Sequence, residues 1–297
     1  MLQARKAILV VNLHKENAHS TAEEIRKELE KRGTQVTTFA FEGRPGSVPD
    51  GAWDIAFSLG GDGTVLYAAR ILASTETPII PIHLGTLGFL AGVERQEWLS
   101  VYEGWLNNSA WLSSRCMLGF SVQRGAAETA VFAGACLNDM VISSAGKAKL
   151  IHLRLNTKIA SGECADLGCY RSDGLVIATP TGSTAYSMAA GGPILDPEME
   201  AIVVSPICPF TLSNRPLVLP ARQTLLVTVE KEQRSDIMLT IDGQDIFDME
   251  PGDTITIDQF PHHARLITTG RSSYYSALKD KLEWGGGSAN PEGLAYA

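Results

Sequence analysis

The sequence has few of the residues that build disulfides, metal sites and nucleic-acid-binding surfaces. Its five cysteines are an odd number without a Cys-x-x-Cys pair, and its six histidines show no metal-ligand spacing. The 25 Lys and Arg are outnumbered by 33 Asp and Glu, and the net charge of −8 argues against general binding of nucleic acid or of an anionic membrane. We therefore expect reduced thiols, and we expect any phosphate-bearing ligand to be bound at a local site.

Long apolar runs are also missing. No stretch approaches the ~18 apolar residues of a membrane span, and Met1 to Lys6 leads into a strand pattern without the apolar core of a signal peptide. These features predict a soluble, cytoplasmic protein. With 297 residues, 44 % of them apolar, the chain has enough hydrophobic content for one large domain or two smaller ones.

Residues 1–110 alternate strand and helix patterns. Ser20 and Glu23 form a capping-box pattern ahead of an apolar helix face that ends at Gly33. Further helices are predicted at residues 65–73 and 94–107, and strands at 8–13, 36–41, 53–59 and 79–83. This order predicts an α/β domain in which helices cover a parallel sheet.

Residues 111–271 instead show short alternating segments separated by turn residues. Strands are predicted at 120–123, 131–143, 150–159, 225–229, 237–241, 254–257 and 265–268, with one helix at 184–190. The pattern predicts an all-β domain of antiparallel strands. Residues 272–297 form a C-terminal segment whose end, after about Gly286, is expected to be loose.

The segment Gly60-Gly61-Asp62-Gly63-Thr64 lies between a predicted strand and a predicted helix. Its glycines allow a bound group to approach the backbone, and the helix N-terminus offers N–H groups and the positive end of the helix dipole to phosphate. The segment is neither a Walker A loop nor a Rossmann G-x-G-x-x-G. Because Asp62 would repel phosphate, it needs a role such as holding a metal ion or accepting a proton from an attacking hydroxyl, and both belong to phosphoryl transfer. The alternative is a glycine-rich turn in which Asp62 caps the helix.

A second segment, Asp173–Pro193, combines a strand, a Pro-Thr-Gly-Ser turn and a short helix of small residues with one aromatic, Tyr186. Hydroxyl and N–H groups gathered at a helix start favour nucleotide binding. A helix that packs tightly on a sheet would show a similar density of small residues. This segment alone therefore leaves both interpretations open.

The sequence resembles the NAD kinases, enzymes that phosphorylate the 2′-hydroxyl of the adenosine ribose of NAD to give NADP. The matching segments occur in the family's order over most of the chain, from about residue 7 to residue 285. They are Gly60–Thr64, Leu84–Leu90, Leu137–Asp139, Asp173–Pro193, Pro206–Pro209, Thr211–Leu217 and Asp242–Gln244.

The resemblance implies the two-domain fold of this family, with an α/β domain at residues 1–110, a β-rich NAD-binding domain at 111–271, and a segment at 272–297 that returns to the first domain. NAD and the phosphate donor, ATP or polyphosphate, would meet in the cleft between the domains. Mg²⁺ would accompany the donor phosphates rather than be fixed by protein side chains. The partners would be nucleotides and copies of the same chain, in a homodimer or homotetramer, and not nucleic acid or membrane.

The resemblance also assigns roles to individual residues. Asp62 matches the family's proton acceptor and, with Gly63, contacts NAD, while Gly60, Gly61, Asp62, Gly63 and Thr64 form the phosphate-donor loop. Further NAD contacts fall on Asn138, Asp139, Lys149, Arg171, Asp173, Gln244 and the turn Thr184, Ala185, Tyr186, Ser187, Met188 and Ala189. The departures from the family's usual residues are Asp139 in place of Glu, Phe210 in place of His, and His83 and Leu84 in place of Asn and Arg.

Plainer interpretations exist for several of these residues. By themselves, Asn138 and Asp139 could form an ordinary turn, Arg171 and Asp173 a surface ion pair, and Gln244 part of a hairpin. Two other functions also stay open: a lipid or sugar kinase that shares the Gly-Gly-Asp-Gly loop, and a non-catalytic sensor that binds the dinucleotide. A sensor would have no use for Asp62, and the other kinases are not expected to combine the Thr184–Ala189 turn with Asp242–Gln244.

Overall fold

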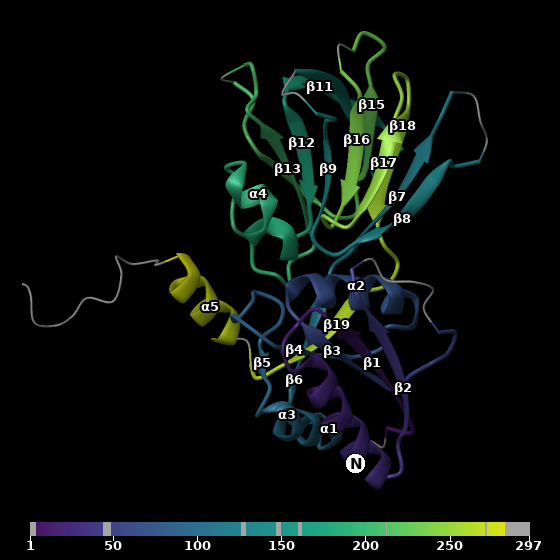
Figure 1. Ribbon diagram of the computed structural model, residues 1–297. Coiled ribbons are helices and arrows are strands. Elements are labelled where there is room, and N and C mark those ends of the chain that lie inside the picture. Colours follow the sequence, from purple (N-terminus) through teal and green to yellow (C-terminus); the bar gives the residue numbers. More distant parts are fainter. Residues whose placement is uncertain are drawn as a thin grey trace, which may run out of the picture. The chain divides into compact units, whose positions relative to one another are not determined.

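The computed structural model shows a chain that folds as two compact units (Figure 1). The first unit comprises Met1–Ala68, Thr77–Ser113 and Arg265–Ala297, and the second comprises Ala69–Glu76 and Ser114–Ala264. The structure describes residues 4–43, 49–125, 129–146, 150–159, 162–211, 213–233, 235–270 and 272–282. Lys149 and the end of the chain after Gly286 lie outside these ranges.

The first unit is built on a sheet of seven strands in the order β2-β1-β3-β4-β19-β6, with β5 paired to β4. The pairs that join β1, β2, β3, β4, β5 and β19 are all parallel, which confirms the predicted parallel sheet. β3 is buried along its whole length, as expected for a strand covered on both faces. The strands are β1 (Lys6–Asn12), β2 (Gln35–Phe41), β3 (Ile55–Gly60), β4 (Ile79–His83), β5 (Val93–Glu94), β6 (Trp111–Arg115) and β19 (Ala264–Thr268).

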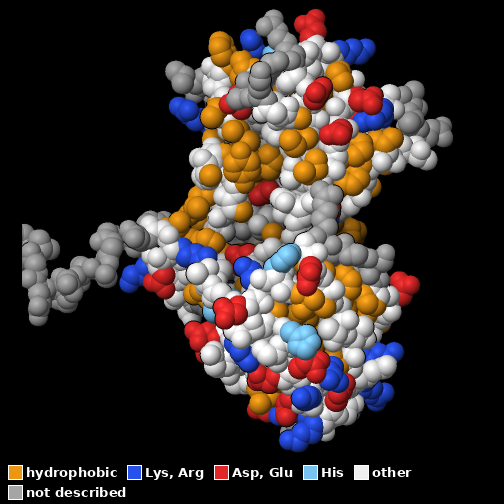
Figure 2. All heavy atoms as spheres, viewed as in Figure 1, with side chains coloured by type: hydrophobic (Ala, Val, Ile, Leu, Met, Phe, Trp, Pro, Cys, Tyr) orange, Lys and Arg blue, Asp and Glu red, His pale blue; other side chains and the backbone are white. Residues whose placement is uncertain are grey.

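Helices cover both faces of this sheet. α1 (Ala18–Lys31) and α3 (Trp98–Leu106) share one hydrophobic core with alternate residues of β1, β3 and β4, while α2 (Asp62–Leu72) lies on the opposite side (Figure 1). The surface over α1 and α3 carries charged side chains of both signs (Figure 2). The end of α2 from Ala69 onward and the short η1 (Ala73–Thr75) belong to the second unit, and α5 (Ser272–Leu282) is the last described helix of the chain.

The predicted capping box at the start of α1 is wrong. The helix begins at Ala18, two residues before Ser20, after Asn17 has turned the chain with a left-handed φ of 63°. The Ser20 hydroxyl donates to the carbonyl of Asn17. Ser20 therefore lies inside the first turn rather than in front of it.

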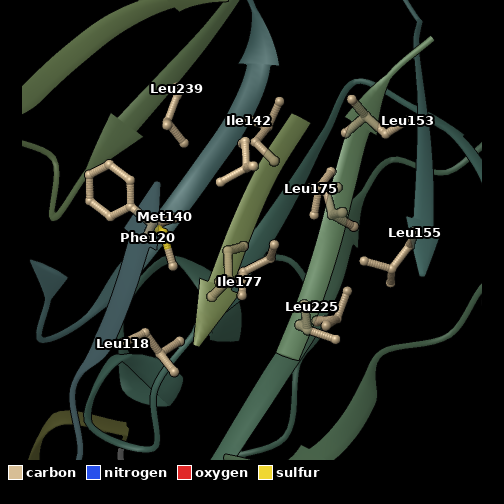
Figure 3. Close-up of a cluster of buried hydrophobic side chains, with 14 of the residues drawn as sticks. Leu118, Phe120, Met140, Ile142, Leu153, Leu155, Leu175, Ile177, Leu225 and Leu239 are labelled. Atoms are coloured by element: carbon tan, nitrogen blue, oxygen red, sulfur yellow. The ribbon is translucent and has the colours of Figure 1, made fainter. Parts of the chain in front are cut away.

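The second unit contains two six-stranded sheets, β11-β10-β15-β18-β7-β8 and β14-β13-β12-β9-β16-β17, and all their printed pairs are antiparallel. Side chains from both sheets form one core (Figure 3). This confirms the β-rich second region. The strands are β7 (Leu118–Gln123), β8 (Phe132–Cys136), β9 (Asp139–Ser144), β10 (Ile151–Lys158), β11 (Cys164–Ser172), β12 (Gly174–Ala178), β13 (Ala201–Ile207), β14 (Leu217–Pro220), β15 (Thr224–Val229), β16 (Ile237–Ile241), β17 (Asp245–Met249) and β18 (Thr254–Gln259).

Four predicted elements differ from the structure. The helix expected at residues 94–107 begins only at Trp98, because Glu94 belongs to β5. The strand expected at residues 131–143 is interrupted at Leu137 and Asn138, which separate β8 from β9. The helix expected at 184–190 is a 3-10 turn, η2 (Thr181–Thr184), followed by the single-turn α4 (Tyr186–Ala189). The strand expected at 265–268 is β19, which pairs with β4 in the parallel sheet and not with the antiparallel strands. Within the described part of the chain, no helix has the length and apolarity needed to cross a membrane.

Candidate active site

Asp62 is the first residue of α2 and follows directly on the end of β3. Its carboxylate accepts three main-chain N–H groups from the loop after β4. Phe89 donates to Oδ2 at 2.9 Å, while Leu90 and Ala91 donate to Oδ1 at 3.1 and 2.8 Å. The side chain is half-buried and is held in one orientation by these bonds.

Gly88 explains why the loop after β4 can approach this carboxylate. A Cβ at Gly88 would lie 1.7 Å from Asp62 Oδ1, well inside van der Waals contact. The loop also contacts α5 of the same unit, because the Lys281 ammonium lies 4.8 Å from the centre of the Phe89 ring. The sequence segment Leu84–Leu90 therefore belongs to the surroundings of Asp62.

Gly60, Gly61 and Thr64 complete the loop around Asp62. A Cβ at Gly60 would lie 2.1 Å from the Thr64 hydroxyl, so Gly60 is needed for the packing of the helix start. A Cβ at Gly61 would meet nothing within 4 Å, which leaves open space beside the loop. Thr64 is buried, and its hydroxyl has no hydrogen-bond partner among the described residues. This end of α2 can accept an anion through its dipole and N–H groups.

In the second unit, Leu137–Asp139 form the connection between β8 and β9, and their backbone is held from two sides. The Thr179 hydroxyl donates to the carbonyl of Leu137, and the Thr179 N–H donates to the carbonyl of Asn138 at 2.8 Å. A Cβ at Gly182 would lie 2.0 Å from the same Asn138 oxygen. On the other side, the Asp242 carboxylate accepts the N–H groups of all three residues.

Asp139 joins three of the predicted segments. Its side chain accepts the N–H of Tyr186, and its carbonyl accepts the N–H of Asp242 at 2.9 Å. Burial, followed by the negative charge of Asp242, raises the pKa of Asp139 to about 7. Burial also raises the pKa of Asp242, but three N–H donors and the Arg70 guanidinium oppose that rise. Of the two carboxyl groups, Asp139 therefore holds a proton more readily.

The Thr184–Ala189 turn presents its residues in two directions. Thr184 is buried, with its hydroxyl directed to the Thr181 carbonyl, and Ser187 is fully buried, with its hydroxyl 3.0 Å from that of Ser205. Tyr186 and Ala189 are exposed, and Ala185 and Met188 are half-buried. The Ser187 hydroxyl is thus used inside the protein, whereas Tyr186 can contact a ligand.

The remaining predicted contacts lie at other positions of the second unit. The Gln244 side-chain oxygen accepts an N–H from Arg70 at 3.3 Å, and the neighbouring Asp245 pairs with the same guanidinium. Arg171 is exposed, with its guanidinium 5.0 Å from the centre of the exposed Phe210 ring. Among the described ion pairs there is none between Arg171 and Asp173. Lys149 lies outside the described residues.

Although Phe89, Leu90, Thr179 and Asp242 lie in segments that match the family, sequence reasoning assigned no role to the residues that hold the predicted ones in place. These are the Phe89–Ala91 amides around Asp62, and Asp242, Thr179 and Arg70 in the second unit. Asp242 was within reach, because an Asp-Gly pair after an alternating strand marks a hairpin turn whose acidic side chain can accept backbone N–H groups. The other partners carry no local signal, since each lies far along the chain from the residue that it contacts. Among the described residues, no group of three or more His, Cys, Asp or Glu is placed to hold a metal ion.

Comparison with known proteins shows which family the chain resembles over nearly its whole length. The family models described as the ATP-NAD kinase N-terminal and C-terminal domains match residues 47–109 and 137–269. An NAD kinase of Treponema denticola is 38 % identical over 286 residues, which is 96 % of this chain and 98 % of that protein. An NAD kinase of Geobacter sulfurreducens is 36 % identical over 289 residues, which is 95 % of this chain and 99 % of that protein.

Two solved structures share the fold. The crystal structure of yeast NADH kinase complexed with NADH matches with a TM-score of 0.84 and 23 % identity, covering 95 % of this chain and 88 % of that one. An NAD kinase from Archaeoglobus fulgidus in complex with ATP matches with a TM-score of 0.67 and 23 % identity, covering 94 % and 98 %. Together with the full-length relatives, these findings show that the chain belongs to the NAD kinase family.

Proposed function

We propose that this NAD kinase transfers the terminal phosphate of ATP to the 2′-hydroxyl of NAD and that Asp62 accepts the proton of that hydroxyl. The observation that carries the proposal is the fixed Asp62 carboxylate at the N-terminus of α2. An ionised carboxylate has about four acceptor positions, and three are taken by the amides of Phe89, Leu90 and Ala91. None of the bonds of the described residues occupies the fourth, on Oδ2, which we assign to the ribose hydroxyl.

The chemistry needs positioning more than a strong base. Phosphoryl transfer passes through a loose transition state with little bond formation to the attacking oxygen, so the proton can be removed late. A carboxylate fixed by three hydrogen bonds does not have to be ordered when the substrate binds. Asp62 therefore orients the hydroxyl first and receives its proton as the new P–O bond forms.

The donor phosphates would bind at the start of α2. Support comes from the helix N-terminus, the open space at Gly61 and the buried Thr64 hydroxyl. The one carboxylate of the loop, Asp62, is occupied by three amides and by the proposed ribose hydroxyl, and Mg²⁺ in nucleotide sites commonly keeps several waters beside the substrate phosphates. These residues fit a Mg²⁺ carried mainly by the donor, where it would neutralise the charge of the transferred group. The ATP complex of the Archaeoglobus fulgidus relative supports ATP as the donor.

The dinucleotide would bind to the second unit, on Asn138, Asp139, Asp173 and the Thr184–Ala189 turn. Asp139 and the N–H of Tyr186 already meet, and the Tyr186 ring is exposed beside them. An exposed aromatic ring can stack on an adenine or nicotinamide ring. The Arg171 guanidinium contacts the Phe210 ring and the Gln244 side chain accepts an N–H from Arg70, so NAD would have to share or displace these contacts.

The family resemblance supports a cytoplasmic homodimer or homotetramer. Three exposed free thiols, Cys164, Cys169 and Cys208, are compatible with a reducing compartment. Size-exclusion chromatography with light scattering measures the mass of the assembly, and a monomer at micromolar concentration would contradict the oligomer.

The function is tested by mixing the purified protein with NAD, Mg²⁺ and either ATP or polyphosphate, and by measuring NADP with an NADP-specific dehydrogenase. We expect NADP formation with ATP. Formation with polyphosphate alone would overturn the donor assignment, while NAD binding without NADP would indicate a sensor. Phosphorylation of a lipid or a sugar in place of NAD would indicate the other kinases.

A further inference from the structure

The Asp242 carboxylate binds the backbone of the predicted NAD-binding turn, Leu137–Asp139, through three hydrogen bonds. Its Oδ2 accepts the N–H of Leu137 at 3.0 Å, and its Oδ1 accepts those of Asn138 and Asp139 at 2.7 and 3.1 Å. Its own N–H donates to the Asp139 carbonyl. One residue of the β16–β17 hairpin thus binds three consecutive residues more than 100 positions earlier in the chain.

The backbone conformation and burial of Asp242 suit a residue that accepts backbone N–H groups inside the protein. The residue has a left-handed φ of 48° and is 7 % exposed. Asp and Asn are the side chains that adopt this backbone region most readily. Only Asp supplies two acceptor oxygens there, because the amide of Asn would turn an N–H donor toward the N–H of the turn.

With its backbone bonded to Asp242 on one side and to Thr179 on the other, the Leu137–Asp139 turn has little freedom. What the turn offers to a ligand is the side chain of the half-buried Asn138 and the carboxylate of Asp139, a residue that is 5 % exposed and already accepts the N–H of Tyr186. We infer that Asp242 is a positioning residue for NAD, because its carboxylate fixes the turn backbone so that these two side chains are presented in the binding conformation. The inference rests on the proposed role of the turn in NAD binding.

Asp242 also acts on the charge of Asp139. The ionisable groups around this carboxyl are Asp242 itself, the Cys136 thiol from β8, and Arg70 from α2, which acts on both Asp242 and Cys136. Burial raises the pKa of the Cys136 thiol well above its usual range, so this thiol stays neutral. Removing the negative charge of Asp242 would therefore lower the pKa of Asp139, and the ionised form of Asp139 would extend to lower pH.

The test is the variant Asp242→Asn, which keeps the size and the left-handed backbone but loses one acceptor and the charge. We expect the KM for NAD to rise about tenfold, as for the loss of hydrogen bonds to a charged group, while the KM for ATP stays unchanged and kcat falls less. The pH at which kcat/KM for NAD reaches half its maximum should move below that of the wild type. A purely structural role would not move that midpoint.

Three further variants make the result decisive. Asp253→Asn is the matched control, because Asp253 is also a buried carboxylate and accepts the N–H of Glu250 in another hairpin of the same unit. This variant should lower Tm and leave the KM for NAD unchanged. Asn138→Ala should raise the KM for NAD, and an unchanged KM there would refute the proposed NAD site itself.

A folded Asp242→Asn with the wild-type KM for NAD and the wild-type pH midpoint, together with an impaired Asn138→Ala, would overturn the positioning role. If Asp242→Asn does not fold, Thr179→Val tests the same restraint from the other side, and a wild-type KM for NAD in that variant would equally overturn it.

Discussion

Among the residues that the structure describes, two carboxylates accept three backbone N–H groups each, Asp62 in the first unit and Asp242 in the second. The two differ in burial: Asp62 is half-buried and keeps one acceptor position on Oδ2, whereas Asp242 is buried. We therefore propose that Asp62 accepts the proton of the ribose hydroxyl and that Asp242 fixes the backbone of Leu137–Asp139. Burial and the negative charge of the neighbouring Asp242 raise the pKa of Asp139 to about 7.

The stability of the protein should depend on pH through Asp139. Its pKa rises from an ordinary value of about 3.9 to about 7 in the folded state, so the folded chain binds the proton more tightly than the unfolded chain. The stabilisation from this proton is complete below about pH 4 and is lost as the pH rises through about 7.

Asp139→Asn should remove this contribution, since the amide has no proton to lose and its oxygen can still accept the N–H of Tyr186. We expect the fall in Tm between pH 5 and pH 8 to be smaller in the variant than in the wild type, while its KM for NAD rises. Thermal unfolding at the two pH values measures the first effect. Equal pH dependence in both proteins would show that Asp139 is ionised throughout this range.

At the scale of elements, the loop after β4 and the start of α2 form one unit of structure, because Gly88 allows the loop amides to reach Asp62. Gly61 lies in the same region but faces open space. The two glycines therefore offer a matched pair of substitutions to Ala, one that disturbs the carboxylate and one that disturbs only what approaches the loop.

Gly88→Ala should lower kcat by about 100-fold, a loss that a displacement of about 1 Å can cause at a reacting group, because the new methyl group displaces the Asp62 carboxylate. Gly61→Ala should leave Tm unchanged and raise the KM for ATP, because its methyl group would stand where the donor phosphates approach. Steady-state kinetics with each substrate separate the two effects. A Gly61→Ala enzyme with an unchanged KM for ATP would place the donor elsewhere.

Elements with a strong local pattern could be predicted from the sequence, and elements set by distant partners could not. β4 and β16 match their predicted residues 79–83 and 237–241, because each is a short apolar or alternating run between turn residues. The break between β8 and β9 is fixed by Asp242, 105 residues away from Leu137, and nothing local marks it. β19 has an ordinary strand pattern, but its sequence cannot tell whether it joins a parallel or an antiparallel sheet. Likewise the Asp62 loop is visible in the sequence, while the amides that hold it are not.

At the scale of the whole molecule, the proposed work is divided between the units. The first carries Asp62 and the donor loop, and the second carries the Leu137–Asp139 and Thr184–Ala189 segments. The hydrogen bonds that hold Asp62 come from residues 89–91, and those that hold Leu137–Asp139 come from Asp242 and Thr179. The two substrates should therefore slow hydrogen exchange in different segments of the protein.

Hydrogen exchange followed by mass spectrometry can detect which segments each substrate protects. We expect NAD alone to slow exchange most in peptides that contain Leu137–Asp139 and the Thr184–Ala189 turn. A non-hydrolysable ATP analogue with Mg²⁺ should slow exchange most in peptides that span Gly60–Thr64. The reverse pattern, with NAD protecting the donor loop alone, would contradict the division between the units.

The most direct test of the central claim is the activity of Asp62→Asn, with Asp54→Asn as the matched control. Asp54 precedes the same strand, β3, and its carboxylate also accepts two main-chain N–H groups, from Arg5 and Lys6, but it lies at the opposite end of that strand. We expect Asp62→Asn to bind NAD with a Kd within about threefold of the wild type and to form NADP at least about 100-fold more slowly, in line with the loss of a positioned proton acceptor, while Asp54→Asn keeps the wild-type rate. An Asp62→Asn protein that forms NADP at close to the wild-type rate would contradict the account.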